Sequence, residues 1–245
     1  MTVDVIFLAY RDWSLKVFPA IQKHPKVEKC VLCTTVEQLQ KLALPEYDLL
    51  ITCGWSDEIG AELSSRMLAI GVHCAELDRY SYGTPLQNQI MDGVKYTKHR
   101  VFKFTYDDKS PRTHTHSREY SHEVALDLSG NMEDVLVQMT STSIVLFNMF
   151  LDDYPNICWN QWPEEPERRT KRTPQDSKLS KEDVVHMTTE QLYNFMRCLE
   201  HPYPNAYLED ETGRLYFERV RFKRKPLLSA KSPVVGHAPL GQPAT

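Results

Sequence analysis

A histidine and a run of amides lie close together in the stretch GVHCAELDRYSYGTPLQNQI, residues 71–90. His73 follows an apolar run, and Gln87 and Asn88 stand in a triplet of amides near the end of the stretch. An imidazole can take up or release a proton near neutral pH, and amides can bind a polar substrate through both N–H and C=O groups. These residue types suit general acid–base catalysis, and a hydrogen-bonded structural histidine in a surface loop is the alternative.

Strands and helices alternate through the first half of the chain, which is typical of an α/β domain with a parallel sheet. Apolar runs rich in β-branched residues predict strands, and helical spacing or a capping signal predicts helices between them. The expected strands are 3–10, 27–35, 47–55 and 71–77, and the expected helices are 15–23, 35–44 and 56–70. Ligands bind such sheets beyond the carboxyl ends of the strands. His73 lies at or near the end of the fourth strand, and this position favours a functional role.

The second half of the chain mixes strands with helices. Pro85 in a first turn and Gly93 at a C-terminus predict a helix over 84–93, and Glu211–Gly213 predicts a turn between two strands. The other expected elements are a strand at 98–106, a polar loop or hairpin at 107–123, the end of a strand at 123–131 and helices at 132–154 and 188–200.

The expected fold class is α/β, with a Rossmann-like parallel or mixed sheet flanked by helices and a small C-terminal α+β appendage. The expected organisation is a catalytic domain at 1–155, a connector at 156–180, a helix and hairpin segment at 181–222 and a flexible tail at 223–245. The tail is rich in Pro, Ala and Ser, which is typical of poorly ordered termini.

Composition narrows the class of protein. The chain has 245 residues, 41% hydrophobic and 25% charged, with a net charge of −4, which favours a soluble globular protein without a broad surface for polyanions. It contains no run of 18 apolar residues and no cleavage-site pattern, so neither a membrane span nor a signal peptide is expected. Cys30 and Cys33 form a CxxC pair without a second pair, so buried free thiols and a reducing, cytoplasmic location are expected.

Several blocks of sequence together resemble the formyltransferase family. The blocks are YDLLITCGWSDEI, GVHCAELDRYSYGTPLQNQI, LDLSGNMEDVLVQM, RTPQDSKLS and QLYNFMRCLEHPYPNAY, and the likeness in order and spacing covers roughly residues 1–222. Members of this family transfer the formyl group of N10-formyltetrahydrofolate to an amine. The resemblance therefore implies N10-formyltetrahydrofolate as the cofactor and an amine as the acceptor.

The resemblance also implies catalytic residues. The family signature is Asn-x-His at the end of the fourth strand, with an Asp downstream; His73 matches the His, and Gly71 occupies the place of the Asn. The segment that carries the Asp is longer here, so its equivalent is ambiguous. We expect Asp108 to take that role because it directly follows a strand, with Asp107 next and His116 as a rival from the loop. A rearranged site or a loss of activity would also explain these departures.

Binding residues follow from the same likeness. The loop 54–59 is implied to hold the pterin of the cofactor, and a further block forms the floor beside the histidine. The implied cofactor-binding residues are Trp55, Ser56, Ile59 and Glu76, and the implied substrate-binding residues are Gly83, Thr84, Pro85, Gln87, Asn88, Asn194 and Tyr203. Each of these groups also has a purely structural alternative. Trp55 would pack on the sheet rim, residues 83–88 would form only a turn and the start of a helix, and Asn194 and Tyr203 would belong to a buried aromatic corner. No metal is expected, because no Cys or Asp pattern accompanies His114, His116 and His122.

The acceptor expected from the sequence is a nucleotide-linked amino sugar. Methionyl-tRNA enzymes of the family usually carry a longer basic C-terminal domain, and a negatively charged chain is a poor ligand for tRNA. A member that binds folate or sugar without turnover is an alternative, as is a methionyl-tRNA acceptor. A nicotinamide cofactor is not expected because LAYRDW after the first strand contains no Gly. A homodimer is compatible with the sequence.

Overall fold

The computed structural model describes residues 1–56, 59, 63, 66–80, 83–105, 115–161 and 169–225. A mixed seven-stranded sheet in the order β2-β1-β3-β4-β5-β6-β7 forms its centre. The strands are β1 (Val3–Leu8), β2 (Val27–Cys33), β3 (Leu49–Thr52), β4 (Leu68–His73), β5 (Tyr96–Thr105), β6 (Thr115–Asp127) and β7 (Asn160–Gln161). Strands β1 to β4 are parallel, and β5, β6 and β7 each run antiparallel to the strand before them in this order. The expected α/β fold class is confirmed.

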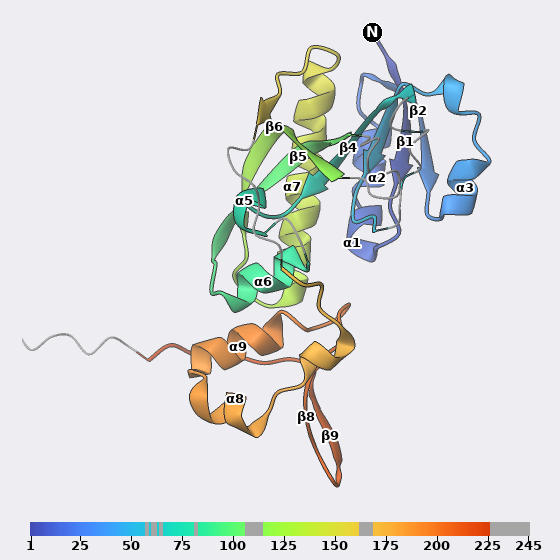
Figure 1. Cartoon of the computed structure of the whole chain (residues 1–245). Helices are drawn as coiled ribbons and strands as arrows, with labels where there is room; N and C mark the ends of the chain where they lie inside the picture. The colour runs from blue at the N-terminus through green and yellow to red at the C-terminus, as the bar shows by residue number, and fades with distance from the viewer. Residues whose placement is uncertain are drawn as a thin grey trace, which may run out of the picture.

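Helices cover both faces of the sheet (Figure 1). They are α1 (Asp12–Leu15), α2 (Phe18–Gln22), α3 (Val36–Gln40), α5 (Leu77–Tyr80), α6 (Pro85–Met91), α7 (Met132–Asp153), α8 (Lys181–His186) and α9 (Thr189–Arg197), with 3-10 turns at Leu44–Glu46 and Pro174–Ser177. On one face Phe7 of β1 packs edge-on against Phe147 of α7, with ring centroids 6.2 Å apart. On the other face Leu8 and Leu50 form a second buried cluster with Leu39 of α3.

Helix α7 is the longest helix of the described chain. Asn131 begins it with a capping box, because its side chain accepts from the Asp134 N–H and the Asp134 carboxylate accepts from the Asn131 N–H. The helix is long and apolar enough to cross a membrane by length and composition alone. It lies along the sheet, and Phe147 and Phe150 are fully buried there, as in the core helix of a globular domain.

Two sequence-based boundaries were wrong near the histidine. The expected helix 56–70 does not reach residue 70, because β4 begins at Leu68, and this strand ends at His73 rather than at 77. Leu68, Ala69 and Ile70 pair in parallel with β3, and so short an apolar run cannot be distinguished from the end of a buried helix by periodicity.

Of the two expectations for 107–123, a hairpin or a loop, the hairpin agrees with the antiparallel pairing of β5 and β6, although the second strand is longer than expected. Thr115–Asp127 forms one strand of 13 residues, in which Glu123 pairs with Arg100 and Tyr120 with Phe102. Its many polar side chains hide the strand pattern in the sequence. Farther upstream, the expected helix 15–23 is two short helices, and Pro19 lies in the first turn of the second.

The C-terminal segment packs against the end of the sheet domain (Figure 1). It contains α8, α9 and a hairpin of β8 (Ala206–Asp210) and β9 (Gly213–Phe217), which confirms the expected turn. Arg197 of α9 fastens the segment, since its Nη1 donates to the carbonyl oxygens of Leu128 and Gly130 at 2.6 and 2.9 Å. Helix α8 was not anticipated, and β7 lies within the expected connector, where it pairs with β6.

Candidate active site

His73 is the last residue of β4, and its neighbours come from β5. His73 pairs with Arg100 and Gly71 with Phe102 across the antiparallel strands. The His73 ring stands edge-on to the Phe102 ring, with centroids 6.4 Å apart. Side chains alternate along a strand, so the direction of the β5 residues on either side shows which face His73 occupies.

His99 and Val101 point to α7. The Nδ1 of His99 lies 2.7 Å from the Thr142 hydroxyl of α7, and burial lowers the pKa of His99 to about 3, so this imidazole stays neutral and structural. Arg100, Phe102 and His73 therefore lie on the opposite face, which α7 does not cover. His73 is half-buried on that face, whereas His99 is fully buried against α7.

Arg100 forms a fixed cation across the strand from His73. Its Nε donates to Glu123 Oε2 at 2.8 Å, and its guanidinium lies 4.6 Å from the centroid of the Tyr120 ring. Burial acts to raise the pKa of Glu123, but hydrogen bonds from Lys98 and Arg100 outweigh it and lower this pKa. The carboxylate therefore stays charged and holds Arg100 in place. A fixed guanidinium near a reacting carbonyl can stabilise negative charge as it develops.

Gly71 has no room for a side chain. A Cβ at this position would lie 2.4 Å from Thr52 Oγ1 and 2.8 Å from Phe102 Cζ. The family asparagine therefore cannot be accommodated, because Thr52 Oγ1 and the Phe102 ring fill its place. The glycine that replaces the family asparagine thus lies opposite a bulky residue, Phe102, on the neighbouring strand β5.

Gln89, which the sequence analysis did not single out, holds the chain after His73 in position. Its Nε2 donates to the carbonyl oxygens of Cys74 and Pro85 at 2.9 and 3.1 Å, and its Oε1 accepts from the Thr97 hydroxyl at 2.5 Å. The residue is fully buried. It therefore ties α6 to the end of β4 and to β5, and the triplet of amides was the sequence signal for it.

Gln87 and Tyr203 meet although they lie far apart in the sequence. Gln87 hydrogen-bonds the Tyr203 phenol. Burial raises the pKa of Tyr203, so the phenol is neutral at ordinary pH. Two predicted substrate-binding residues, one on α6 and one in the C-terminal segment, thus come together.

Asn88 of α6 and Thr84, the residue just before this helix, have buried polar side-chain atoms. Among the residues that the structure describes, Asn88 Nδ2 and Thr84 Oγ1 have no hydrogen-bond partner. Buried polar groups are normally bonded, so these atoms are candidates for binding a ligand. Pro85 is the first residue of α6, as expected.

Gly83 is required by the connector that crosses it. Its φ is +80°, and a Cβ would lie 2.8 Å from the carbonyl oxygen of Thr170 and 2.9 Å from that of Arg169. Arg169 anchors this crossing through Asp92 at 2.9 Å, and the Tyr80 hydroxyl donates to the same carboxylate. The turn at Gly83 thus serves as a docking point for the connector.

Gly83→Ala should lower the free energy of unfolding by about 2 kcal/mol or more, because it adds backbone strain and a clash with two carbonyl groups. That corresponds to a fall in Tm of roughly 4–8 °C in a chain of this size. Gly93→Ala is the matched control: its φ is +78°, but only Asn194 Nδ2, at 3.8 Å, faces the new Cβ. Equal losses of Tm in the two variants would show that the connector contact contributes nothing.

The loop after β3 faces the residues after β1. Ser56 Oγ accepts from the Tyr10 hydroxyl at 2.8 Å, and Trp55 stands edge-on to Tyr10 with centroids 5.5 Å apart. Trp55 Nε1 is buried without a hydrogen-bond partner in the described part of the chain, as a donor to a bound cofactor would be. Ile59 is buried in the second core cluster, where it contacts the sheet.

Four predicted site residues remain. Asp108, like Asp107, lies outside the described residues, and so does the side chain of His116, whose backbone pairs with Phe104. Glu76 is half-buried, and its carbonyl oxygen accepts from the Tyr80 N–H. Asn194 is buried and accepts from Arg197 Nε at 2.9 Å, so its described contact stabilises the C-terminal segment.

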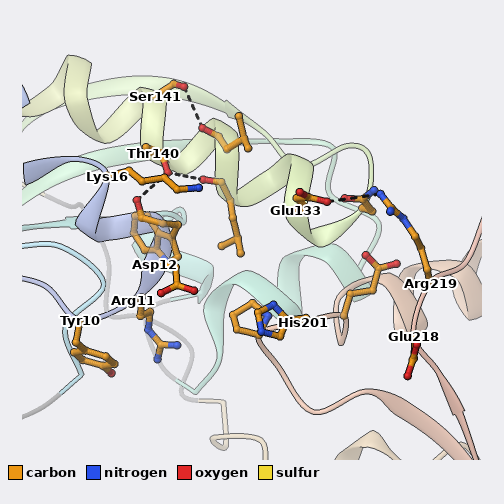
Figure 2. Close-up of a pocket in the computed structure, with 16 residues that line it drawn as sticks. Tyr10, Arg11, Asp12, Lys16, Glu133, Thr140, Ser141, His201, Glu218 and Arg219 are labelled. Atoms are coloured by element: carbon orange, nitrogen blue, oxygen red, sulfur yellow. Dashed lines mark hydrogen bonds and ion pairs between the residues drawn. The ribbon is translucent and has the colours of Figure 1, made fainter.

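A cavity of about 790 Å³ adjoins this region (Figure 2). It is lined by residues after β1, by the first half of α7 and by the turn at His201 and Pro202. Tyr10 and Arg11 line it, and both also contact Ser56. His73 is not a lining residue, and the link from the cavity to the predicted site runs through Ser56.

The solved structures to which this chain is similar include formyltransferases and HypX. A methionyl-tRNA formyltransferase from Clostridium thermocellum aligns over 90% of this chain and 94% of its own, with 22% identity and a TM-score of 0.75. A sugar N-formyltransferase from Shewanella aligns over 91% and 99%, with 13% identity and a TM-score of 0.67. HypX from Aquifex aeolicus, in complex with tetrahydrofolic acid, aligns over 85% of this chain and 36% of its own, with 12% identity and a TM-score of 0.65. No protein-family model and no curated protein matches the sequence.

Proposed function

We propose that this protein, which has the fold of formyltransferases, transfers the formyl group of N10-formyltetrahydrofolate to the amine of a nucleotide-linked amino sugar. The observation that carries the proposal is the place of His73, which ends β4 across from the buried Arg100. Gln89 of α6 donates to the carbonyl of Cys74, the residue after His73, and Gln87 of the same helix hydrogen-bonds Tyr203. An acid–base residue, a fixed cation and polar binding groups are what acyl transfer to an amine needs.

In this proposal each residue has a stated task. N10-formyltetrahydrofolate supplies the formyl group. The imidazole of His73 accepts the proton that the amine loses as its nitrogen bonds to the formyl carbon. His73 then returns a proton to N10 of the folate as the bond between N10 and the formyl carbon breaks, which leaves tetrahydrofolate and the N-formylated amine, and Arg100 stabilises negative charge on the oxygen in between. Asp108 remains the proposed carboxylate that orients His73, and the loop at Trp55 and Ser56 remains the proposed site of the pterin.

The residues present suit a folate. Trp55 Nε1 is a buried donor without a described partner, beside the aromatic ring of Tyr10. A pterin ring offers hydrogen-bond acceptors and a flat face, so it would satisfy both features. HypX, a structural neighbour, was solved with tetrahydrofolic acid, which supports a reduced folate as the cofactor.

Charge supports a small acceptor over tRNA. The chain has a net charge of −4, and a large polyanion prefers a basic surface. Length does not separate the two acceptor classes, contrary to the sequence-based argument, because the methionyl-tRNA formyltransferase matches this chain over 94% of its own length. A methionyl-tRNA acceptor is therefore the alternative amine. Six unpaired cysteines support a cytoplasmic location.

One observation favours a second candidate function. The place of the family asparagine is filled by Thr52 Oγ1 and the Phe102 ring, so the oxyanion would lose one donor, at a cost of about 3 kcal/mol if nothing replaces it. A protein that binds folate or a nucleotide sugar without turnover would tolerate this loss.

Incubation with N10-formyltetrahydrofolate and a panel of nucleotide-linked amino sugars is expected to yield an N-formylated sugar, detected by product mass. Calorimetric titration is expected to show binding of 5-formyltetrahydrofolate, which is a stable analogue of the donor. Binding of NAD without a folate signal would overturn the cofactor. Folate binding without any formylated product, with methionyl-tRNA included in the panel, would favour the non-catalytic candidate.

A further inference from the structure

The cavity of about 790 Å³ contains a cation, Arg11, that also contacts the loop proposed for the cofactor. Arg11 lines it and also donates from Nη2 to Ser56 Oγ at 3.3 Å, in the loop proposed for the cofactor. The charge of Arg11 acts on the phenol of Tyr203, in the segment proposed to close over the acceptor. In Figure 2 the side chains of Arg11, Asp12 and His201 lie around the same open space.

The guanidinium of Arg11 is left with donors to spare. No carboxylate pairs with it among the residues that the structure describes, and its contacts there are the long bond to Ser56 and the Tyr10 ring, 5.3 Å away. A guanidinium carries five N–H donors in a planar fork. A half-buried arginine with most of its donors unused is suited to bind an anion with two oxygen atoms side by side.

None of the carboxylates that line the cavity pairs with Arg11 in the described part of the chain. Glu133 pairs with Arg219 at 3.7 Å, and Asp12 and Glu218 are exposed. Glu200 is buried: its Oε2 accepts from the Met132 N–H at the start of α7 at 3.1 Å, and its Oε1 has no described partner. Lys16, which is exposed, adds a second cation to the lining. The guanidinium of Arg11 is therefore not neutralised by a described carboxylate and is available to a ligand in the cavity.

We propose that Arg11 binds the diphosphate of the nucleotide-linked acceptor in this cavity, with Lys16 as a second, weaker contact. This inference rests on the proposed function and names the residue that recognises the substrate class. The glutamate tail of the folate is the other anion that could reach Arg11. The acceptor is favoured because Arg11 shares the cavity with His201 and lies near Tyr203, and both belong to the C-terminal segment.

The test is calorimetric titration of the full chain and two variants with dTDP, UDP and 5-formyltetrahydrofolate. Arg11→Gln is expected to weaken dTDP or UDP binding by at least about 10-fold, the loss of one charge-assisted contact. Folate affinity is expected to fall by less than nucleotide affinity, because Arg11 reaches the loop proposed for the cofactor only through the 3.3 Å bond to Ser56. The dependence of the nucleotide Kd on salt should also become shallower. Arg219→Gln is the matched control, because it removes an arginine from the same cavity whose charge is already paired with Glu133.

Several outcomes would overturn the inference. They are unchanged nucleotide affinity in Arg11→Gln, an equal loss in Arg219→Gln, a loss confined to folate, and no binding of either nucleotide by the parent protein. Formyl transfer is measured separately on the same samples. If the protein transfers the formyl group but Arg11→Gln leaves nucleotide affinity unchanged, only the role of Arg11 is rejected. If Arg11→Gln weakens nucleotide binding but the parent protein formylates no amine, the role of Arg11 is supported and the proposed activity is rejected.

Discussion

Replacing His73 by asparagine is expected to reduce formyl transfer by about 10²–10⁴-fold, because the variant loses the group that moves the proton. Asparagine keeps a similar volume and hydrogen-bonding capacity, so the Phe102 contact and the end of β4 should persist. The loss should appear in kcat rather than in KM for the amine. Rates measured with saturating folate, together with Tm, would separate chemistry from folding.

His122→Asn is the matched control for this prediction. His122 also lies in the sheet, but its Nε2 bonds Asp153 of α7 at 3.0 Å and its ring faces Phe150, on the face opposite His73. Turnover in that variant should stay near the parent value even if Tm falls. Near-normal turnover in His73→Asn would remove His73 from the mechanism and leave the non-catalytic candidate as the better account.

Restoring the family residue by Gly71→Asn is expected to damage the protein rather than activate it. The new Cβ would lie 2.4 Å from Thr52 Oγ1 and 2.8 Å from Phe102 Cζ, inside van der Waals contact. Overpacking of a buried site typically costs about 1–3 kcal/mol, and contacts this short place the expected loss at about 3 kcal/mol. Urea unfolding would measure it, and turnover should not rise.

The double variant Gly71→Asn/Phe102→Ala tests which neighbouring residue, Phe102 or Thr52, excludes an asparagine at position 71. If the Phe102 ring fills the place of the asparagine, removing it should make the pair less destabilised than the sum of the single variants by at least about 1 kcal/mol. Gly71→Ala, which adds only the Cβ, should show a smaller coupling. Additive losses in urea unfolding would mean that Thr52, on the neighbouring strand β3, is the dominant contact instead.

Several residues of the candidate site could be predicted from the sequence because their positions depend on local sequence patterns. His73 follows a buried strand, and Pro85 and Gly93 bound the amide helix as expected. Arg100 and Glu123 were missed because their role depends on register. In an antiparallel sheet, a shift by one residue would turn both side chains toward α7. The polar residues of β6 concealed the strand that sets this register.

By itself, the sequence determined the class of fold, the succession of strands and helices along the first half of the chain, and the presence of His73 in or near the fourth strand, since these follow from hydrophobic periodicity and from Gly and Pro at helix ends. Only the tertiary structure decided three other features: that Phe102 occupies the space beside Gly71, that Arg100 stands across from His73, and that Tyr203 reaches Gln87 over more than a hundred residues of chain. Each of these joins side chains from different elements, and packing between elements leaves no periodic trace along a single chain.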